Sequence, residues 1–242
     1  MQNHYVGDIG DYLKLGILRA LSPGYRLGVA WWLYPDEIHD RNGKHVGYIE
    51  RPEQWRHFDP ALFDALKHIV SSGQRNVHAL AATGLLPDTI FHHQPLPTIG
   101  RNRREARQEW FRTVLQTVKD TDIVFVDPDN GLESDGLTHG SAKAGKSVLL
   151  SELRDLAGPN RCLIVYHHQT RRVGGHSAEI EHWLGRLRSD GFRAADALRC
   201  KLWSPRVFFL LNASEELRQR AARIETDWHR LIAWHPGEQS AS

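Results

Sequence analysis

The feature of this sequence that most constrains its fold is a series of short, continuously apolar runs separated by longer amphipathic stretches. The runs RLGVAWWL at 26–33, DIVFV at 122–126 and RCLIVY at 161–166 have the length of strands and place apolar side chains on both faces. Uninterrupted runs of this kind are typical of parallel strands that helices cover on both sides. The sequence therefore predicts an α/β protein.

Helical spacing of apolar residues fills most of the intervals between strands. Helices are predicted at 11–21, 60–70, 74–80, 101–119, 147–156, 178–189 and 214–234. Two further strands, predicted at 192–198 and 206–211, lie too close together for a helix to join them, so we expect an antiparallel pair at one edge of the sheet. Alternating strands and helices imply right-handed crossovers and a doubly wound, mostly parallel sheet. Residues 87–97 show neither pattern clearly.

The length of 242 residues fits one domain, which we expect over 1–235, with a flexible tail at 236–242. Lysine and arginine total 31 against 29 acidic residues, a balance that alone does not indicate a nucleic-acid binder. Cys162 and Cys200 lie in predicted buried strands, so neither a disulfide scaffold nor a cysteine zinc site is expected. No leader is visible, and no stretch approaches the roughly 20 apolar residues that cross a bilayer, so we expect a cytoplasmic protein.

The candidate chemical centre is Asp127-Pro128-Asp129-Asn130, which directly follows the DIVFV strand. In open parallel sheets, ligands bind beyond the carboxyl ends of the strands. The Asp127 carboxylate can accept a hydrogen bond from a substrate amine or a cofactor hydroxyl, and Pro128 stiffens the backbone. Asn130-Gly131 permits a left-handed turn that lets the main chain approach a ligand. A tight turn made of turn-forming residues is the alternative explanation.

A second candidate is the turn GDIGDYLK at 7–14, which leads into the first predicted helix. Asp8 or Asp11 can cap that helix or contact a ligand. Lys14 lies in the first turn of the predicted helix, where a positive charge opposes the helix dipole. Its position therefore makes more sense if an anion, a carboxylate or a phosphate, lies nearby.

Polar residues also follow the other two buried strands. Tyr34 and Asp36 follow the first strand, where an acidic residue could bind ribose hydroxyls or simply belong to a polar loop. His167 and His168 follow the third strand, and adjacent residues in an extended chain point to opposite sides, so at most one should face the crevice.

Two further ligand classes remain open. A metal ion could use one of the paired histidines, His167 or His168, with Asp127, Asp129, His139 or His176 as further ligands, but the spacing matches no zinc pattern. An anionic partner such as RNA or DNA could contact the arginine-rich 101–119 helix and four further cations, although arginines on a helix face often serve only solubility. These four cations are Lys143, Lys146, Arg171 and Arg172.

The usual nucleotide and hydrolase signatures are absent. The sequence contains no G-x-G-x-x-G, no G-x-x-x-x-G-K-[ST] and no G-x-S-x-G. This absence argues against a conventional NAD enzyme, a P-loop nucleotide triphosphatase and an α/β-hydrolase.

Two motifs and their order resemble the large-subunit ribosomal RNA adenine-N6 methyltransferases. GDIGDYLK resembles the G-N-H-A-D-V-L-K opening of that family, and IVFVDPDN resembles its strand ending in D-P-P-Y. The later order is also similar, with a strand ending in tyrosine (LIVY), a helix, and closing strands ending in asparagine (FFLLN). The matching residues are Gly7, Asp11, Leu13, Lys14, Asp127 and Pro128.

The resemblance implies a Rossmann-like sheet of the methyltransferase type, S-adenosylmethionine as cofactor, and methyl transfer to an amine. Lys14 would lie near the methionine end of the cofactor and Asp127 near the target amine. Asp129 and Asn130 stand where the family has a proline and an aromatic residue that stacks on the flipped base. The glycine-rich cofactor loop is also missing after the first strand.

We therefore expect a methyltransferase-like enzyme that acts on an amine of a nucleic acid or another anionic substrate. The alternatives are a metal-dependent phosphodiesterase or nuclease, and a non-catalytic Rossmann-like binding module. The expected cofactor-binding residues are Gly7, Asp8, Asp11, Lys14, Tyr34 and Asp36, and the expected substrate-binding residues are His167, His168, Arg171, Lys143 and Lys146.

Overall fold

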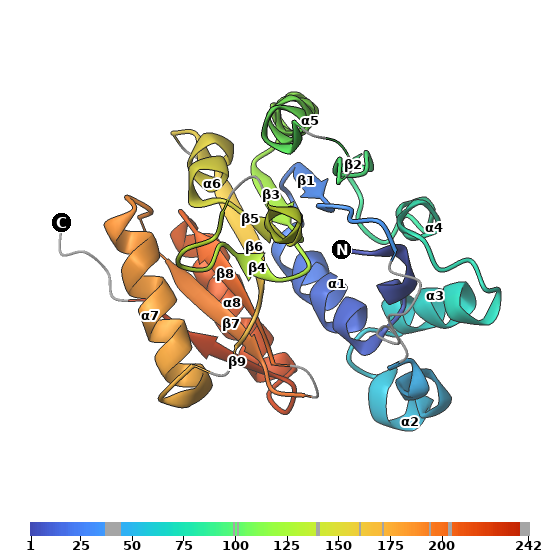
Figure 1. Cartoon of the computed structure of the whole chain (residues 1–242). Coiled ribbons are helices and arrows are strands. Elements are labelled where there is room, and N and C mark those ends of the chain that lie inside the picture. The colour runs from blue at the N-terminus through green and yellow to red at the C-terminus, as the bar shows by residue number, and fades with distance from the viewer. Residues whose placement is uncertain are drawn as a thin grey trace.

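The computed structural model describes most of the chain. The described residues are 1–36, 45–98, 100, 102–138, 141–159, 161–170, 172–193, 195–202 and 205–237, without the side chains of residues 142 and 143. They form an α/β fold built on a seven-stranded, mostly parallel mixed sheet with helices on both faces (Figure 1). Among these residues, no helix is long and apolar enough to cross a membrane.

The main sheet has strands drawn from the whole length of the chain. They are β1 (Leu27–Ala30), β2 (Thr89–His92), β3 (Ile123–Val126), β6 (Cys162–His168), β7 (Asp196–Cys200), β8 (Arg206–Leu211) and β9 (Ile232–His235). A separate small sheet pairs β4 (Gly131–Leu132) with β5 (Ser147–Val148).

The helices connect these strands. They are α1 (Ile9–Leu21), α2 (Pro52–Trp55), α3 (Pro60–Ser71), α4 (Val77–Ala82), α5 (Arg103–Thr117), α6 (Leu150–Ala157), α7 (Gly175–Ser189) and α8 (Glu215–Asp227). Short 3-10 helices lie at Asn3–Tyr5, Gly47–Glu50 and Ala142–Lys146.

The strand order of the main sheet is β2-β1-β3-β6-β8-β7-β9. β2, β1, β3 and β6 are parallel neighbours, whereas β8 runs antiparallel to both β6 and β7, and β9 runs antiparallel to β7. The chain passes from β1 to β2 on one side and then to β3 on the other side. The carboxyl ends of β1 and β3 therefore flank a topological switch point, the place where open α/β sheets bind ligands.

Side chains from the two faces of the sheet enter two separate cores. On one face, β-strand residues such as Phe125 and Phe208 pack with residues of α1, α3 and α8. On the other face, residues such as Val126 and Phe209 pack with residues of α5, α6 and α7. Because consecutive residues of each strand alternate between these cores, both faces of the central strands must be apolar, as the uninterrupted runs predicted.

The predicted helix at 214–234 is wrong in its last third. Ser214 caps α8 as an acceptor for Leu217 N, but the helix ends at Asp227 and Ile232–His235 form strand β9. β9 pairs with β7, which otherwise would present an unpaired edge, so long-range pairing outweighs local helical spacing. The β7–β8 pair is consequently not at the edge of the sheet, because β9 takes that place.

Other boundaries move by a few residues for similar reasons. The unassigned 87–97 stretch contains the edge strand β2, and the predicted helix at 147–156 begins only at Leu150, since residues 147–148 pair with β4. The strand predicted at 161–166 continues to His168 because β8 pairs with it along its whole length. Of the tail predicted at 236–242, Gly237 donates its amide to buried Asp196 at 2.8 Å, and residues 238–242 lie outside the described residues.

Candidate functional site

The polar residues singled out after three strands lie along one edge of the sheet. Val126, the last residue of β3, pairs in register with Ala30 of β1 and with Val165 of β6. The segments that follow Ala30 and Val126 therefore leave the sheet side by side, while β6 continues beside them to His168. We call this edge, formed by the carboxyl ends of β1, β3 and β6, the rim.

At the centre of the rim, Asp127 and Lys14 form a buried ion pair. Lys14 Nζ lies 2.7 Å from Asp127 Oδ2 and 2.8 Å from Asp11 Oδ1, and all three residues are buried. Burial raises the pKa of Asp127, although the Lys14 ammonium opposes this shift. Burial lowers the pKa of Lys14, but the two carboxylates outweigh burial and raise that pKa above its ordinary value. The anion expected beside Lys14 is thus supplied by the protein itself.

The N-terminal turn of α1 places these groups. Asp8 caps the helix, since its Oδ1 accepts from Asp11 N at 3.0 Å. Asp11 Oδ2 in turn accepts from Gly7 N at 3.1 Å. These local hydrogen bonds fix Asp11 and orient the start of α1 so that Lys14 points at β3.

The first two residues of the chain lie against the Asp127-Pro128-Asp129-Asn130 loop. The Met1 amino group donates to the main-chain oxygen atoms of Asp127 at 2.9 Å and of Trp32 at 3.3 Å. It also lies 2.5 Å from Asp129 Oδ1, and Gln2 Nε2 donates to Asp129 Oδ2 at 2.6 Å. Residues 1–2 therefore connect the ends of β1 and β3 across the switch point.

Tyr34, Asn130 and Lys146 come together on the other side of this loop. Asn130 N donates to Lys146 O at 2.7 Å, and Lys146 Nζ lies 4.9 Å from the centroid of the Tyr34 ring, within the range of a cation–π interaction. Tyr34 N donates to Met1 O at 2.8 Å. An aromatic ring thus stands at the rim, although it comes from the segment after β1 and not from the loop after β3.

Sequence reasoning missed the contact between Tyr166, which is partly buried, and Arg206, which is buried. Arg206 Nη2 lies 4.0 Å from Asp8 Oδ2, and burial raises the pKa of Tyr166 to about 12. Burial and the neighbouring Asp11 also raise the pKa of Asp8. Arg206 Nη1 is buried and has no hydrogen-bond partner within the described part of the chain. An arginine at the first position of a predicted buried strand was the available signal.

The two histidines point to opposite faces, as the strand geometry predicts. His167 is 3% exposed; its Nδ1 accepts from Leu132 N at 3.1 Å, and its Nε2 lies 3.4 Å from Glu179 Oε1. Burial raises the pKa of Glu179, but hydrogen bonds from His167 and Thr170 outweigh burial and lower it to about 2. His168 is exposed and stands opposite Arg206 in the β6–β8 register. Only His168 is therefore on the Arg206 side of the rim.

The other site residues predicted from the sequence do not lie at the centre of the rim. Asp36 lies 3.2 Å from His4 Nδ1 near the surface. Arg171 and His139 fall outside the described residues, as does the side chain of Lys143. No group of three or more histidine, cysteine, aspartate or glutamate residues that could hold a metal ion occurs among the residues that the structure describes.

Gly131, which ends the loop, has a backbone that only glycine adopts without strain. Its φ is +94°, and a Cβ at this position would lie 2.5 Å from His167 Cα and 2.4 Å from His167 Nδ1. Gly131→Ala should therefore lower the free energy of unfolding by at least about 2 kcal/mol, through left-handed strain and a backbone clash.

Gly136→Ala is the matched control for this variant. Gly136 also has a positive φ, of +75°, but a Cβ there would meet no atom within 4 Å. Its substitution should cost only about 1 kcal/mol. Urea denaturation of both variants measures the difference, and equal losses would show that the contact of Gly131 with β6 does not constrain the loop.

A scan against protein-family models and a search of curated proteins both return no match for this chain. Its function is therefore inferred from the fold and from the contacts at the rim.

Proposed function

We propose that this protein is an S-adenosylmethionine-dependent methyltransferase that acts on an amine of a nucleic acid or of another anionic substrate. The observation that carries the proposal is the 2.7 Å contact between Lys14 and Asp127, which are 113 positions apart in the chain. Each belongs to one of the two motifs that resemble the ribosomal RNA adenine-N6 methyltransferases. The contact brings both motifs to the switch point, where a nucleotide-like ligand is expected.

The proposal includes the finer fold type, a Rossmann-like sheet of the methyltransferase kind. Four features support it: the parallel block β2-β1-β3-β6, the switch point between β1 and β3, helices on both faces, and a reversed strand β8 between β6 and β7. The Asp127 loop follows β3, directly beside the switch point.

The side chains near the rim fit the chemistry of this cofactor. S-adenosylmethionine carries a carboxylate, an ammonium group, ribose hydroxyls and an adenine ring. Arg206 Nη1, buried and without a partner among the described residues, can donate to a carboxylate. The carboxyl group of Asp8 can accept from ammonium or hydroxyl groups, and the Tyr34 ring offers a stacking surface.

When bound, the cofactor supplies an electrophilic methyl group on a positively charged sulfur. The protein's part is to position the amine and to stabilise charge. Lys14 has two buried carboxyl partners, Asp11 and Asp127, and with both carboxyl groups ionised the three side chains carry one net negative charge. That charge favours the positive charge that develops on the amine nitrogen during transfer. Main-chain oxygen atoms of the Asp127-Pro128-Asp129-Asn130 loop can accept from the amine and align it.

Transfer of a labelled methyl group tests this proposal. Purified protein with methyl-tritiated S-adenosylmethionine should label RNA or DNA, and Asp127→Asn should lower the rate by about a hundredfold, since it removes the charge but keeps the side-chain shape. Asp120→Asn is the control, because Asp120 is exposed and lies just before the same strand. Equal labelling rates for the two variants would contradict the proposal, as would a protein that methylates neither a nucleic acid nor any other anionic acceptor.

A further inference from the structure

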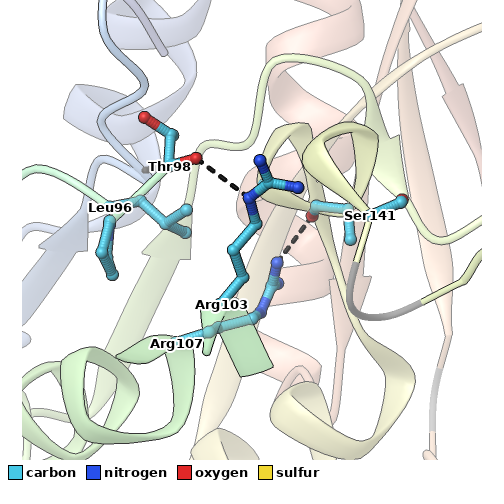
Figure 2. Close-up of a pocket in the computed structure, with 8 residues that line it drawn as sticks. Leu96, Thr98, Arg103, Arg107 and Ser141 are labelled. Carbon is cyan, nitrogen blue, oxygen red and sulfur yellow. Dashed lines mark hydrogen bonds between the residues drawn. The ribbon is translucent and has the colours of Figure 1, made fainter. Parts of the chain in front are cut away.

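A second polar site lies beside the rim, where α5 begins. It is a shallow, open pocket between the segment after β2 and the 3-10 helix Ala142–Lys146 (Figure 2). The pocket is lined by Leu96, Pro97, Thr98, Arg103, Arg107, Ser141, Ala144 and Gly145. Among the residues that the structure describes, this lining contains two arginines and no acidic side chain.

The charge of one arginine is already neutralised. Arg107 is buried, and its Nε and Nη2 donate to Glu152 Oε1 and Oε2 at 2.6 Å and 2.7 Å. It also donates to the main-chain oxygen atoms of Ala144 and Ser147. Arg107 therefore shapes the wall of the pocket and leaves Arg103 as the charge that is open to a ligand.

Arg103 is held in place without using its terminal nitrogen atoms. Its Nε donates to Thr98 O at 3.2 Å, and Figure 2 shows the guanidinium group between Thr98 and Ser141. Within the described part of the chain, neither the Arg103 terminal nitrogen atoms nor the hydroxyl groups of Thr98 and Ser141 have a hydrogen-bond partner. The described lining of the pocket thus offers hydrogen-bond donors and no competing carboxylate, a composition that suits an anion.

The pocket is continuous with the rim. A Cβ on Gly145, which lines the pocket, would lie 3.0 Å from Tyr34 Cε2, so the Tyr34 ring packs against this wall. Leu96 N donates to Leu33 O at 2.8 Å and ties the opposite wall to the segment after β1. Asn130 N, in the Asp127 loop, donates to Lys146 O at 2.7 Å, so a nucleic-acid strand that reaches this loop can bring a neighbouring phosphate to Arg103.

We propose that this pocket binds a backbone phosphate of a nucleic-acid strand and thereby positions the substrate of the methyltransferase. The inference rests on the proposed function, because it assigns the nucleic acid as substrate and places one of its phosphates beside the rim. Arg103 supplies a planar pair of donors that matches two phosphate oxygens, and Ser141 supplies a hydroxyl donor. Such a contact adds affinity without reading sequence.

Fluorescence anisotropy with a labelled single-stranded oligonucleotide tests the pocket. Arg103→Gln should weaken binding about tenfold and reduce the magnitude of the salt slope by about 0.7, the loss of one phosphate contact. Arg104→Gln is the matched control, because Arg104 is the next residue of α5, is exposed and does not line the pocket. It should change binding less than twofold.

A second pair of variants adds negative charge. Ser141→Asp should abolish detectable oligonucleotide binding, whereas Ser134→Asp, on an exposed position outside the pocket, should not. Equal effects of Arg103→Gln and Arg104→Gln would overturn the proposal, because binding would then follow overall charge. Inorganic phosphate should not displace the labelled oligonucleotide when both are present at the same concentration of phosphate groups. If it does, the pocket binds a free anion and the proposal is overturned.

Cofactor binding separates this inference from the proposed function. Arg103→Gln should bind S-adenosylhomocysteine as the unsubstituted protein does, because the pocket is apart from Asp8, Lys14 and Arg206. If the protein binds the cofactor but no oligonucleotide, the phosphate site is wrong and the proposed function stands with another anionic substrate.

Discussion

Lys14→Met is expected to destabilise the protein by about 3 to 5 kcal/mol, because it leaves Asp11 and Asp127 as unpaired buried carboxylates. Methionine keeps the length and apolar stem of lysine, so the decrease in the free energy of unfolding reports the missing charge and not a new cavity. Urea denaturation followed by circular dichroism gives the free energy of unfolding. Lys67→Met, on an exposed position of α3, should change it by less than about 0.5 kcal/mol.

A double variant isolates the pair itself. Asp127→Asn combined with Lys14→Met should cost less than the sum of the two single changes by at least about 1 kcal/mol, because the second change removes a charge that the first left unpaired. Additive losses, or a loss for Lys14→Met no larger than for Lys67→Met, would mean that the two motifs are not joined by this ion pair.

Arg107→Met is the second substitution with a large expected effect, again about 3 to 5 kcal/mol. It removes both hydrogen bonds to Glu152 and the two donated to Ala144 O and Ser147 O. Glu152 also accepts from Leu149 N at the start of α6. We therefore expect the substitution to remove the contacts of α5 with the start of α6 and with the pocket wall at Ala144 at the same time.

Arg112→Met is the control on the same helix. Arg112 forms an exposed ion pair with Glu109, and such pairs contribute less than about 1 kcal/mol. Thermal unfolding of both variants at equal concentration measures the contrast. A smaller loss for Arg107→Met than for Arg112→Met would contradict the role assigned to the buried pair.

The parts of the fold that could be predicted are those set by local pattern. The IVFV run at 123–126 is apolar at every position because both faces of β3 are buried, and the position of the loop that follows it could be predicted from this run. The anion beside Lys14 followed from the dipole argument, although the sequence could not say that Asp11 and Asp127 supply it. The helix-dipole argument predicted an anion beside Lys14, and only the folded structure showed which carboxylates supply it.

What could not be predicted depends on contacts between distant segments. Arg206 meets Tyr166 and Asp8 because β8 inserts between β6 and β7, and no local pattern encodes that register. The edge strand β9 was assigned to a helix for the same reason. Residues 1–2 carry no periodicity, so their contacts with the Asp127 loop were not foreseen.

The central claim is that the rim around Lys14, Asp127 and Arg206 binds S-adenosylmethionine. Isothermal titration calorimetry with S-adenosylhomocysteine, the demethylated product, tests it without knowledge of the methyl acceptor. We expect one molecule bound per chain, with a dissociation constant of about 1 to 100 μM, and at least tenfold weaker binding by Arg206→Met. A folded protein that takes up neither this compound nor S-adenosylmethionine would contradict the claim.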